Sequence, residues 1–228
     1  MLGRSQFESV KQRHGAYASW AVWAPPSEGP KSNIGDLSVL DPDANASLLE
    51  TLKSNVVIVG LNISRSGASH PFRNFHDPSP KANDFKLRYA LSDTPYYGAY
   101  MTDVIKNVAM VNSGELLEHL KVNPALLQKN LDTFRRELLD LNAEKPVILA
   151  LGAASHGILE GALAQSEYAS LIKLTHYSHH IGKEQYRDTI LAQLSLQPPA
   201  GNSPSARTPP QNSNVRAAIT LADGRPSR

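Results

Sequence analysis

An apolar run of strand length, Val56-Val57-Ile58-Val59-Gly60, ends abruptly before Leu61-Asn62-Ile63-Ser64, a cluster with two polar residues. Three later runs stop in the same way: residues 99–101 before Thr102-Asp103, Val147–Leu151 before Gly152, and residues 171–174 before Thr175-His176-Tyr177-Ser178. Short apolar runs separated by helix-length segments predict parallel strands. Because open α/β sheets bind ligands at the carboxyl ends of their strands, we expect these polar clusters to share one site.

Helical patterns lie between the runs. They cover residues 83–91, 113–120, 124–141, 154–164 and 182–194, and Asn123-Pro124 has the cap and first-turn proline typical of a helix start. Alternating strands and helices predict a three-layer α/β/α sandwich around a mostly parallel four-stranded sheet. Right-handed crossovers would place all four strand ends on the same edge.

The length of 228 residues suits one domain, which we expect to span residues 1–196. Its N-terminal segment, with Trp20, Trp23 and several prolines, is irregular and predicts packing onto the domain edge. Residues 197–228 are rich in Pro, Ser and Asn and predict a disordered tail. With no Cys, the chain has no disulfide, no Cys-ligated metal and no thiol nucleophile.

The formal net charge of +2 comes from the tail, and the first 199 residues are about neutral. A local excess of cations lies at Arg65, Arg73, Lys81, Lys86 and Arg88, against Asp77 and Asp84. Any affinity for nucleic acid would therefore come from a local patch, with the basic tail as a second source. The first 14 residues lack a signal-peptide core, and no apolar stretch approaches a membrane span, so we expect a soluble, cytoplasmic protein. We also expect it to be a monomer.

The polar clusters hold an amide, a carboxylate and an imidazole. Asn62 can orient a water or hold a carbonyl, Asp103 can accept hydrogen bonds, and His176 can donate to an oxygen that gains charge. Simpler interpretations stay open, because Asn62 and Asp103 also suit turns and Phe75 also suits a core. The spacing of His176, His179 and His180 lacks an acidic partner, so we expect no metal site.

The order of these segments resembles the uracil-DNA glycosylase superfamily. Gly60-Leu61-Asn62-Ile63-Ser64 is similar to its strand-end GxNPG/S motif, and Arg73-Asn74-Phe75-His76 to the aromatic segment that follows. Residues 99–106 resemble its central strand end, Val147–Gly152 its apolar strand, and His176-Tyr177-Ser178-His179 its HPSP-type closing motif. The resemblance covers residues 56–194.

The resemblance implies a monofunctional DNA glycosylase that needs no metal or cofactor and has DNA as its partner. In such enzymes the target nucleotide is flipped into a pocket at this edge, where the bond from base to deoxyribose is hydrolysed. Asn62 would position the attacking water, and His176 would stabilise charge on O2 of the departing base. The implied base contacts are Phe75, Asp103 and Leu61. The implied phosphate contacts are Ser64, Ser178, Arg65, Arg73 and Lys183.

Three positions depart from the family pattern. Ile63 and Tyr177 stand where the motifs have Pro, and Asp103 stands where many members have a base-reading Asn. A carboxylate would repel O4 of uracil, so we expect a base other than uracil to be the best substrate. Two alternatives stay open: a non-catalytic nucleic-acid or nucleotide-binding relative, and a glycosidase that acts on free nucleosides.

Overall fold

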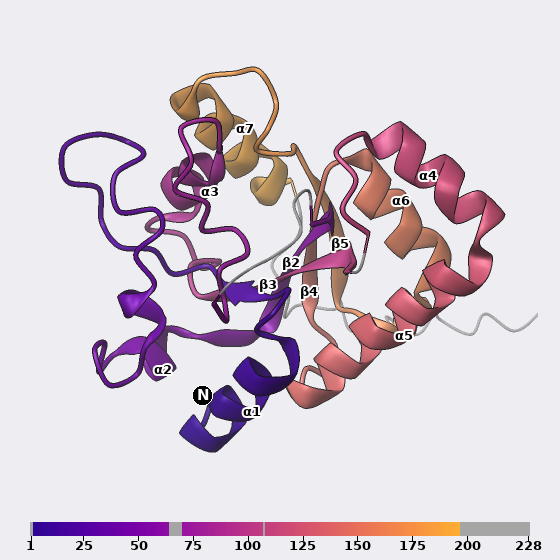
Figure 1. Ribbon diagram of the computed structural model, residues 1–228, viewed down its shortest axis with the longest axis horizontal. Helices are drawn as coiled ribbons and strands as arrows, with labels where there is room; N and C mark the ends of the chain where they lie inside the picture. Colours follow the sequence, from indigo (N-terminus) through magenta and orange to yellow (C-terminus); the bar gives the residue numbers. More distant parts are fainter. Residues whose placement is uncertain (1, 64–69, 107, 197–228) are drawn as a thin grey trace, which may run out of the picture.

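A computed structural model describes residues 2–63, 70–106 and 108–196, and its centre is one five-stranded sheet (Figure 1). The strands are β1 (Ser19–Trp20), β2 (Lys53–Asn62), β3 (Ala99–Ile105), β4 (Val147–Leu151) and β5 (Ser170–Leu174). They lie in the order β1-β3-β2-β4-β5, and all neighbours are parallel except β1 and β3. The predicted mostly parallel α/β fold is confirmed.

The sheet has five strands where we expected four. The additional strand is β1, which pairs antiparallel with β3 through Ser19 and Trp20. It is only two residues long and lies in a segment without a repeating apolar pattern, so the sequence gives no strand signal there.

Seven α-helices and two short 3₁₀ turns surround the sheet among the described residues. The helices are α1 (Arg4–His14), α2 (Leu48–Thr51), α3 (Asp84–Leu91), α4 (Ser113–Val122), α5 (Pro124–Asp140), α6 (Ala153–Ala162) and α7 (Lys183–Ser195). The 3₁₀ turns are η1 (Ser38–Leu40) and η2 (Gln165–Glu167). All five expected helices are present, whereas α1 and α2 were missed. The charged and polar residues of α1 alternate with single buried hydrophobes, Phe7 and Val10, which hides its helical period.

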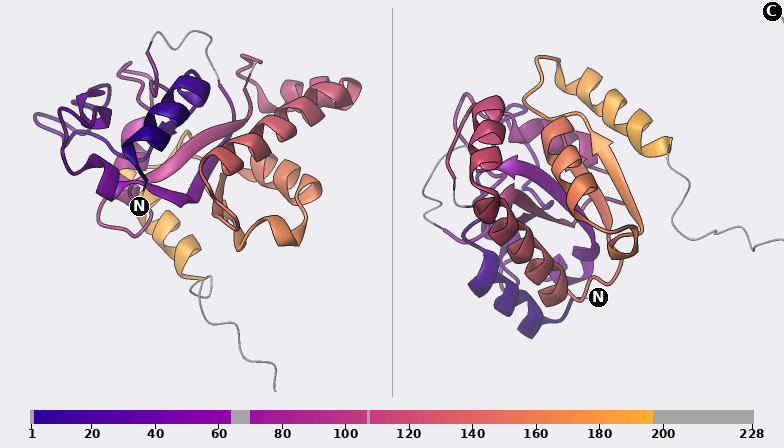
Figure 2. Two further views of the ribbon diagram at one scale, coloured as in Figure 1. Left: turned by 90° about the horizontal axis from the view of Figure 1, so that it is seen from below. Right: turned by 90° about the vertical axis from the view of Figure 1, so that its right-hand side faces the viewer.

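The helices cover both faces of the sheet, as Figures 1 and 2 show. One face packs on α1, α4, α5 and α6, with Phe134 of α5 fully buried. The other packs on α3 and α7, with Tyr186 of α7 fully buried. Side chains alternate between the faces along each strand, so Met101 and Asp103 share the α3/α7 face while Tyr100 and Val104 face α5.

Strand β3 continues four residues beyond its expected end at Met101. Asp103 therefore lies inside the strand and not in a cluster after it. A carboxylate inside a buried strand is unfavourable unless neighbours compensate it, which is why the sequence pattern suggested an earlier strand end. Asn62 is likewise the last residue of β2 and not the second residue of a turn.

Two cations of the expected basic patch are structural. Arg88 is buried and donates to the backbone oxygens of Ala24, Ser32 and Pro30, fixing the Pro-rich N-terminal segment. Lys86 is also buried and donates to the backbone oxygen of His179 at 2.9 Å. The predicted disordered tail, residues 197–228, lies outside the described residues. Within the described ranges, no helix has the length and apolar character to cross a membrane.

Candidate functional site

Asp103 and Gly60 form the centre of the candidate site on the α3/α7 face. They are register partners on the parallel strands β3 and β2. A Cβ atom at position 60 would collide with Oδ1 of Asp103 and would lie 3.5 Å from the Phe75 ring. Gly60 is thus the position that lets the carboxylate and the aromatic ring meet over the sheet.

The loop from 70 to 76 holds both neighbours of Gly60 in place. Nδ2 of Asn74 donates to Oδ2 of Asp103 and to the backbone oxygen of Tyr17, both at 2.8 Å. Phe75 has a left-handed backbone (φ 63°), and its carbonyl accepts from Nε1 of Trp23 at 3.0 Å. These three hydrogen bonds orient the loop against β3 and against the segment that holds Tyr17 and Trp23.

Asp103 is 3 % exposed. Burial is the main influence on the pKa of its carboxyl. It raises the pKa of the carboxyl to about 7, and the Glu137 and Asp84 charges add to that rise. The hydrogen bond from Asn74 and the charge of Lys106 act in the opposite direction. Near neutral pH this carboxyl can therefore serve as a donor or as an acceptor.

A buried ion pair lies on the opposite face of β3. Nζ of Lys106 is 2.7 Å from Oε1 of Glu137 in α5, and both side chains are almost completely buried. Oη of Tyr100 donates to Oε2 of Glu137 at 2.9 Å, and Lys106 also donates to the backbone oxygen of Asp103. This network ties the backbone at Asp103 to α5.

His176 follows β5 and stands beside the end of β4. Its Cβ lies 3.6 Å from the position that a Cβ of Gly152 would occupy. The backbone N–H of Ser178 donates to Nδ1 of His176 at 3.1 Å, and the Ser178 hydroxyl is 2.7 Å from the same nitrogen. Burial lowers the pKa of His176 to about 4. The imidazole is therefore neutral at physiological pH, with its proton on Nε2 as a donor.

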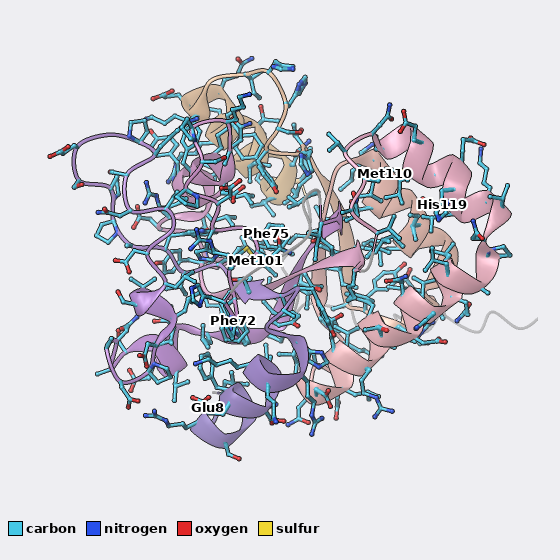
Figure 3. All side chains as sticks on the ribbon, viewed as in Figure 1. Glu8, Phe72, Phe75, Met101, Met110 and His119 are labelled. Carbon is cyan, nitrogen blue, oxygen red and sulfur yellow. The ribbon has the colours of Figure 1, made fainter. Side chains whose placement is uncertain are left out.

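Asn62 holds a loop as well as standing at the end of β2. Its Nδ2 donates to the backbone oxygens of Val108 at 3.0 Å and Met110 at 2.8 Å, and more weakly to that of Ile63. Figure 3 shows Met110 on the side of α4 and Phe75 near the centre. With the amide hydrogens committed, a water at Asn62 would have to bond to Oδ1.

Tyr177, the next residue after His176, packs against the core on the α3/α7 face. Its ring stacks on His176 with centroids 4.4 Å apart, and it packs against the core that contains Phe75. Burial and the nearby Asp84 and Asp103 raise the pKa of its hydroxyl well above the usual value. Phe75 is only 4 % exposed, so a base could reach it and Asp103 only if the covering groups moved.

Comparison of the chain with protein-family models, curated proteins and solved structures finds no match. The candidate site therefore rests on its own geometry. Asn62 at the end of β2 and His176 after β5 stand on either side of the end of β4. The Asp103 carboxyl and the Phe75 ring lie over Gly60 of β2. Such a site can donate one hydrogen bond from His176, hold a water at Asn62 and read a planar ring through Asp103.

The expected base contact at Leu61 is not brought together with Phe75. The Leu61 side chain is buried in the core on the α5 face of the sheet, because strand residues alternate and Gly60 takes the other face. Only its backbone lies next to Gly60.

The expected phosphate contacts are dispersed. Ser178 is exposed and bonds to His176, whereas Nζ of Lys183 bonds to Glu184 at 2.6 Å and lies 3.9 Å from the Tyr89 ring centroid. Arg73 is half-buried in the loop that carries Asn74. Ser64 and Arg65 lie outside the described residues.

Sequence reasoning missed Asn74, Lys106 and Glu137. Asn74 was noted only as part of an aromatic segment, although an amide beside a predicted base contact is a plausible partner for a carboxylate. Glu137 stands at a buried position of α5. The sequence feature that could have identified it is a charged residue on the apolar stripe of that helix. Across the described ranges, no group of three His, Asp or Glu side chains gathers as a metal site would require.

Proposed function

We propose that the chain is a DNA base-excision glycosylase that hydrolyses the bond between a flipped-out base and its deoxyribose. The observation that carries the proposal is the neutral His176 with Nε2–H as donor, at a strand end two positions along the sheet from Asn62. The order of the motifs along residues 56–194 supports the same reaction.

The chemistry needs a water, a donor and a base pocket. A water held at Oδ1 of Asn62 attacks C1′ of the deoxyribose, and the bond from C1′ to the base nitrogen breaks with its electron pair leaving on the base. Nε2–H of His176 donates to the base oxygen on which this charge builds. The proton of the water passes to solvent, and the leaving base is protonated. A neutral imidazole is suited to this task, because its Nε2–H stabilises the charge through a hydrogen bond and no proton has to leave the ring first.

Asp103 is the group that would select the base. An ionised carboxylate accepts only, so it favours a base that presents an amino group. A protonated carboxyl also donates and can face a carbonyl such as O4 of uracil. With a pKa of about 7, this selection should change across neutral pH.

The test is a panel of DNA strands with one modified base each, treated with the protein at pH 6 and pH 8. We expect base release to prefer amino-bearing bases over uracil at pH 8, and the preference to shrink at pH 6. Asp103→Asn should remove that pH dependence while retaining a hydrogen bond to Asn74. Uracil cleaved as well as or better than every other base at both pH values would contradict this selection.

A non-catalytic nucleic-acid binder is the second candidate. The burial of Phe75 and Asp103 favours it, since both must be uncovered before a base can reach them. Asn62→Ala separates the two candidates. In a glycosylase it lowers turnover far more than affinity, whereas a binder has no turnover to lose.

A further inference from the structure

A groove between α1 and α5 lies outside the site described above. It has a volume of about 700 Å³ and is lined by residues that come from the end of α1 and from one face of α5: His14, Tyr17, Gln128, Lys129, Asp132 and Arg136. Figures 1 and 2 show the two helices next to each other. The lining combines charged and polar groups with apolar surface, unlike the packed cores beneath it.

The groove carries an excess of positive charge. Lys129 and Arg136 are exposed, and no acidic side chain of the described residues lies within ion-pair distance of either. Asp132 is already engaged, because it accepts from Nε2 of Gln128 at 2.8 Å and lies 3.8 Å from Arg135. Two cations are thus available for an anionic ligand.

The floor of the groove is fixed by side-chain hydrogen bonds, one of which ends on the Asp140 carboxylate that Arg13 pairs at 2.7 Å. Oη of Tyr17 is 2.8 Å from Nδ1 of His14, and Nε2 of His14 is 2.8 Å from Oδ2 of Asp140. Burial, with the charges of Glu137 and Asp140, raises the pKa of the Tyr17 hydroxyl. The phenol stays protonated, so the floor adds no negative charge from Tyr17.

Tyr17 also connects the groove to the candidate site. Its backbone oxygen accepts from Asn74, which donates to Asp103 through the same nitrogen. Tyr17 therefore places one end of the groove beside the loop that carries Asn74.

We propose that this groove binds the phosphates of the nucleic-acid strand that continues from the nucleotide at Asp103. Lys129 and Arg136 are seven residues apart on α5, about 10 Å along the helix axis. That spacing is too wide for one isolated anion and suits two non-adjacent phosphates of one strand. The inference rests on the proposed function, because the strand is taken to lead from that site.

The experiment measures binding of a fluorescein-labelled single DNA strand over a range of salt concentrations. Lys129→Ala/Arg136→Ala should weaken binding about tenfold and make the salt slope shallower by about 1.4, the loss of two single-strand phosphate contacts. Lys145→Ala/Lys173→Ala is the matched control, since both lysines are exposed elsewhere and it should bind like the unsubstituted protein. Thermal unfolding of both variants checks the fold.

The proposal is overturned if Lys129→Ala/Arg136→Ala keeps the original affinity and salt slope, or if the control variant loses as much affinity. It is also overturned if the unsubstituted protein does not bind the strand. Base release is measured on the same strands. If bases are released but binding does not depend on Lys129 and Arg136, the groove proposal fails and the proposed function stands. If binding depends on these two residues but no base is released, only the proposed function is contradicted.

Discussion

Asp103 is the residue at which burial and charge conflict most strongly. Its carboxyl lies on the sheet face, with Asn74 on one oxygen and Gly60 beneath the other. The hydrogen bond and the Lys106 charge only partly compensate the loss of water, so the proton is held more tightly than in the unfolded chain. A buried group of this kind reduces stability at neutral pH, which is typical of a position kept for chemistry.

The pH dependence of stability tests this state of Asp103. A pKa raised from 3.8 to about 7 means that the folded protein binds more protons than the unfolded chain between those values, so this group lowers the free energy of unfolding as the pH rises. The loss should be on the order of 3–4 kcal/mol. Urea unfolding from pH 4 to pH 8 should show the fall in the unsubstituted protein relative to Asp103→Asn. Parallel curves for the two proteins would contradict the raised pKa.

His176 should stay neutral where an ordinary histidine titrates. Burial lowers its pKa to about 4, and the Ser178 N–H fixes the tautomer with the proton on Nε2. Long-range ¹H–¹⁵N NMR should show this tautomer unchanged from pH 5.5 to pH 8, with His176→Gln used to assign the signal. A midpoint near 6.5 would show that the imidazole is not held as described.

At the scale of elements, the Asp103 carboxyl of β3 can lie over the neighbouring strand β2 because residue 60 lacks a side chain. Gly60→Ala should lower the free energy of unfolding by about 2 kcal/mol, since the added methyl collides with Oδ1 of Asp103. The cost should shrink in an Asp103→Ala background, giving a coupling above about 1 kcal/mol. Gly157→Ala is the control, because nothing lies within 4 Å of a Cβ there and it should not destabilise helix α6. An equal cost in both backgrounds would place the clash elsewhere.

Strand β3 and helix α5 are joined by the buried pair of Lys106 and Glu137. Lys106→Met should lower the free energy of unfolding by about 3–5 kcal/mol, because it leaves the Glu137 charge buried without a partner. Adding Glu137→Gln should recover a large part of that loss, since the amide is neutral and its oxygen can still accept from Tyr100. Denaturant unfolding of the single and double variants measures both. If the second substitution deepened the loss, the pair would not be the source of the cost.

At the scale of the whole molecule, periodic apolar patterns predicted the layers and the core helices well. They failed where long-range contacts override local pattern. Strand β1 exists only because Ser19 and Trp20 complete the edge of β3, and Lys86 and Arg88 are buried because carbonyl oxygens from distant segments surround them.

The candidate site was predictable in outline and less so in detail. Asn62 and His176 were expected at strand ends, where they lie. The depth of Asp103 was not, since it depends on the β2–β3 register and on Asn74, a contact between residues 29 positions apart.

Detection of the free base by mass spectrometry tests the central claim most directly. The unsubstituted protein and His176→Ala are each mixed in excess with the DNA strand that is cleaved best. We expect release of the intact base by the unsubstituted protein and a single-turnover rate about 100-fold lower in His176→Ala, with strand affinity changed only a few-fold. No free base from any strand, or equal rates for the two proteins, would contradict that claim.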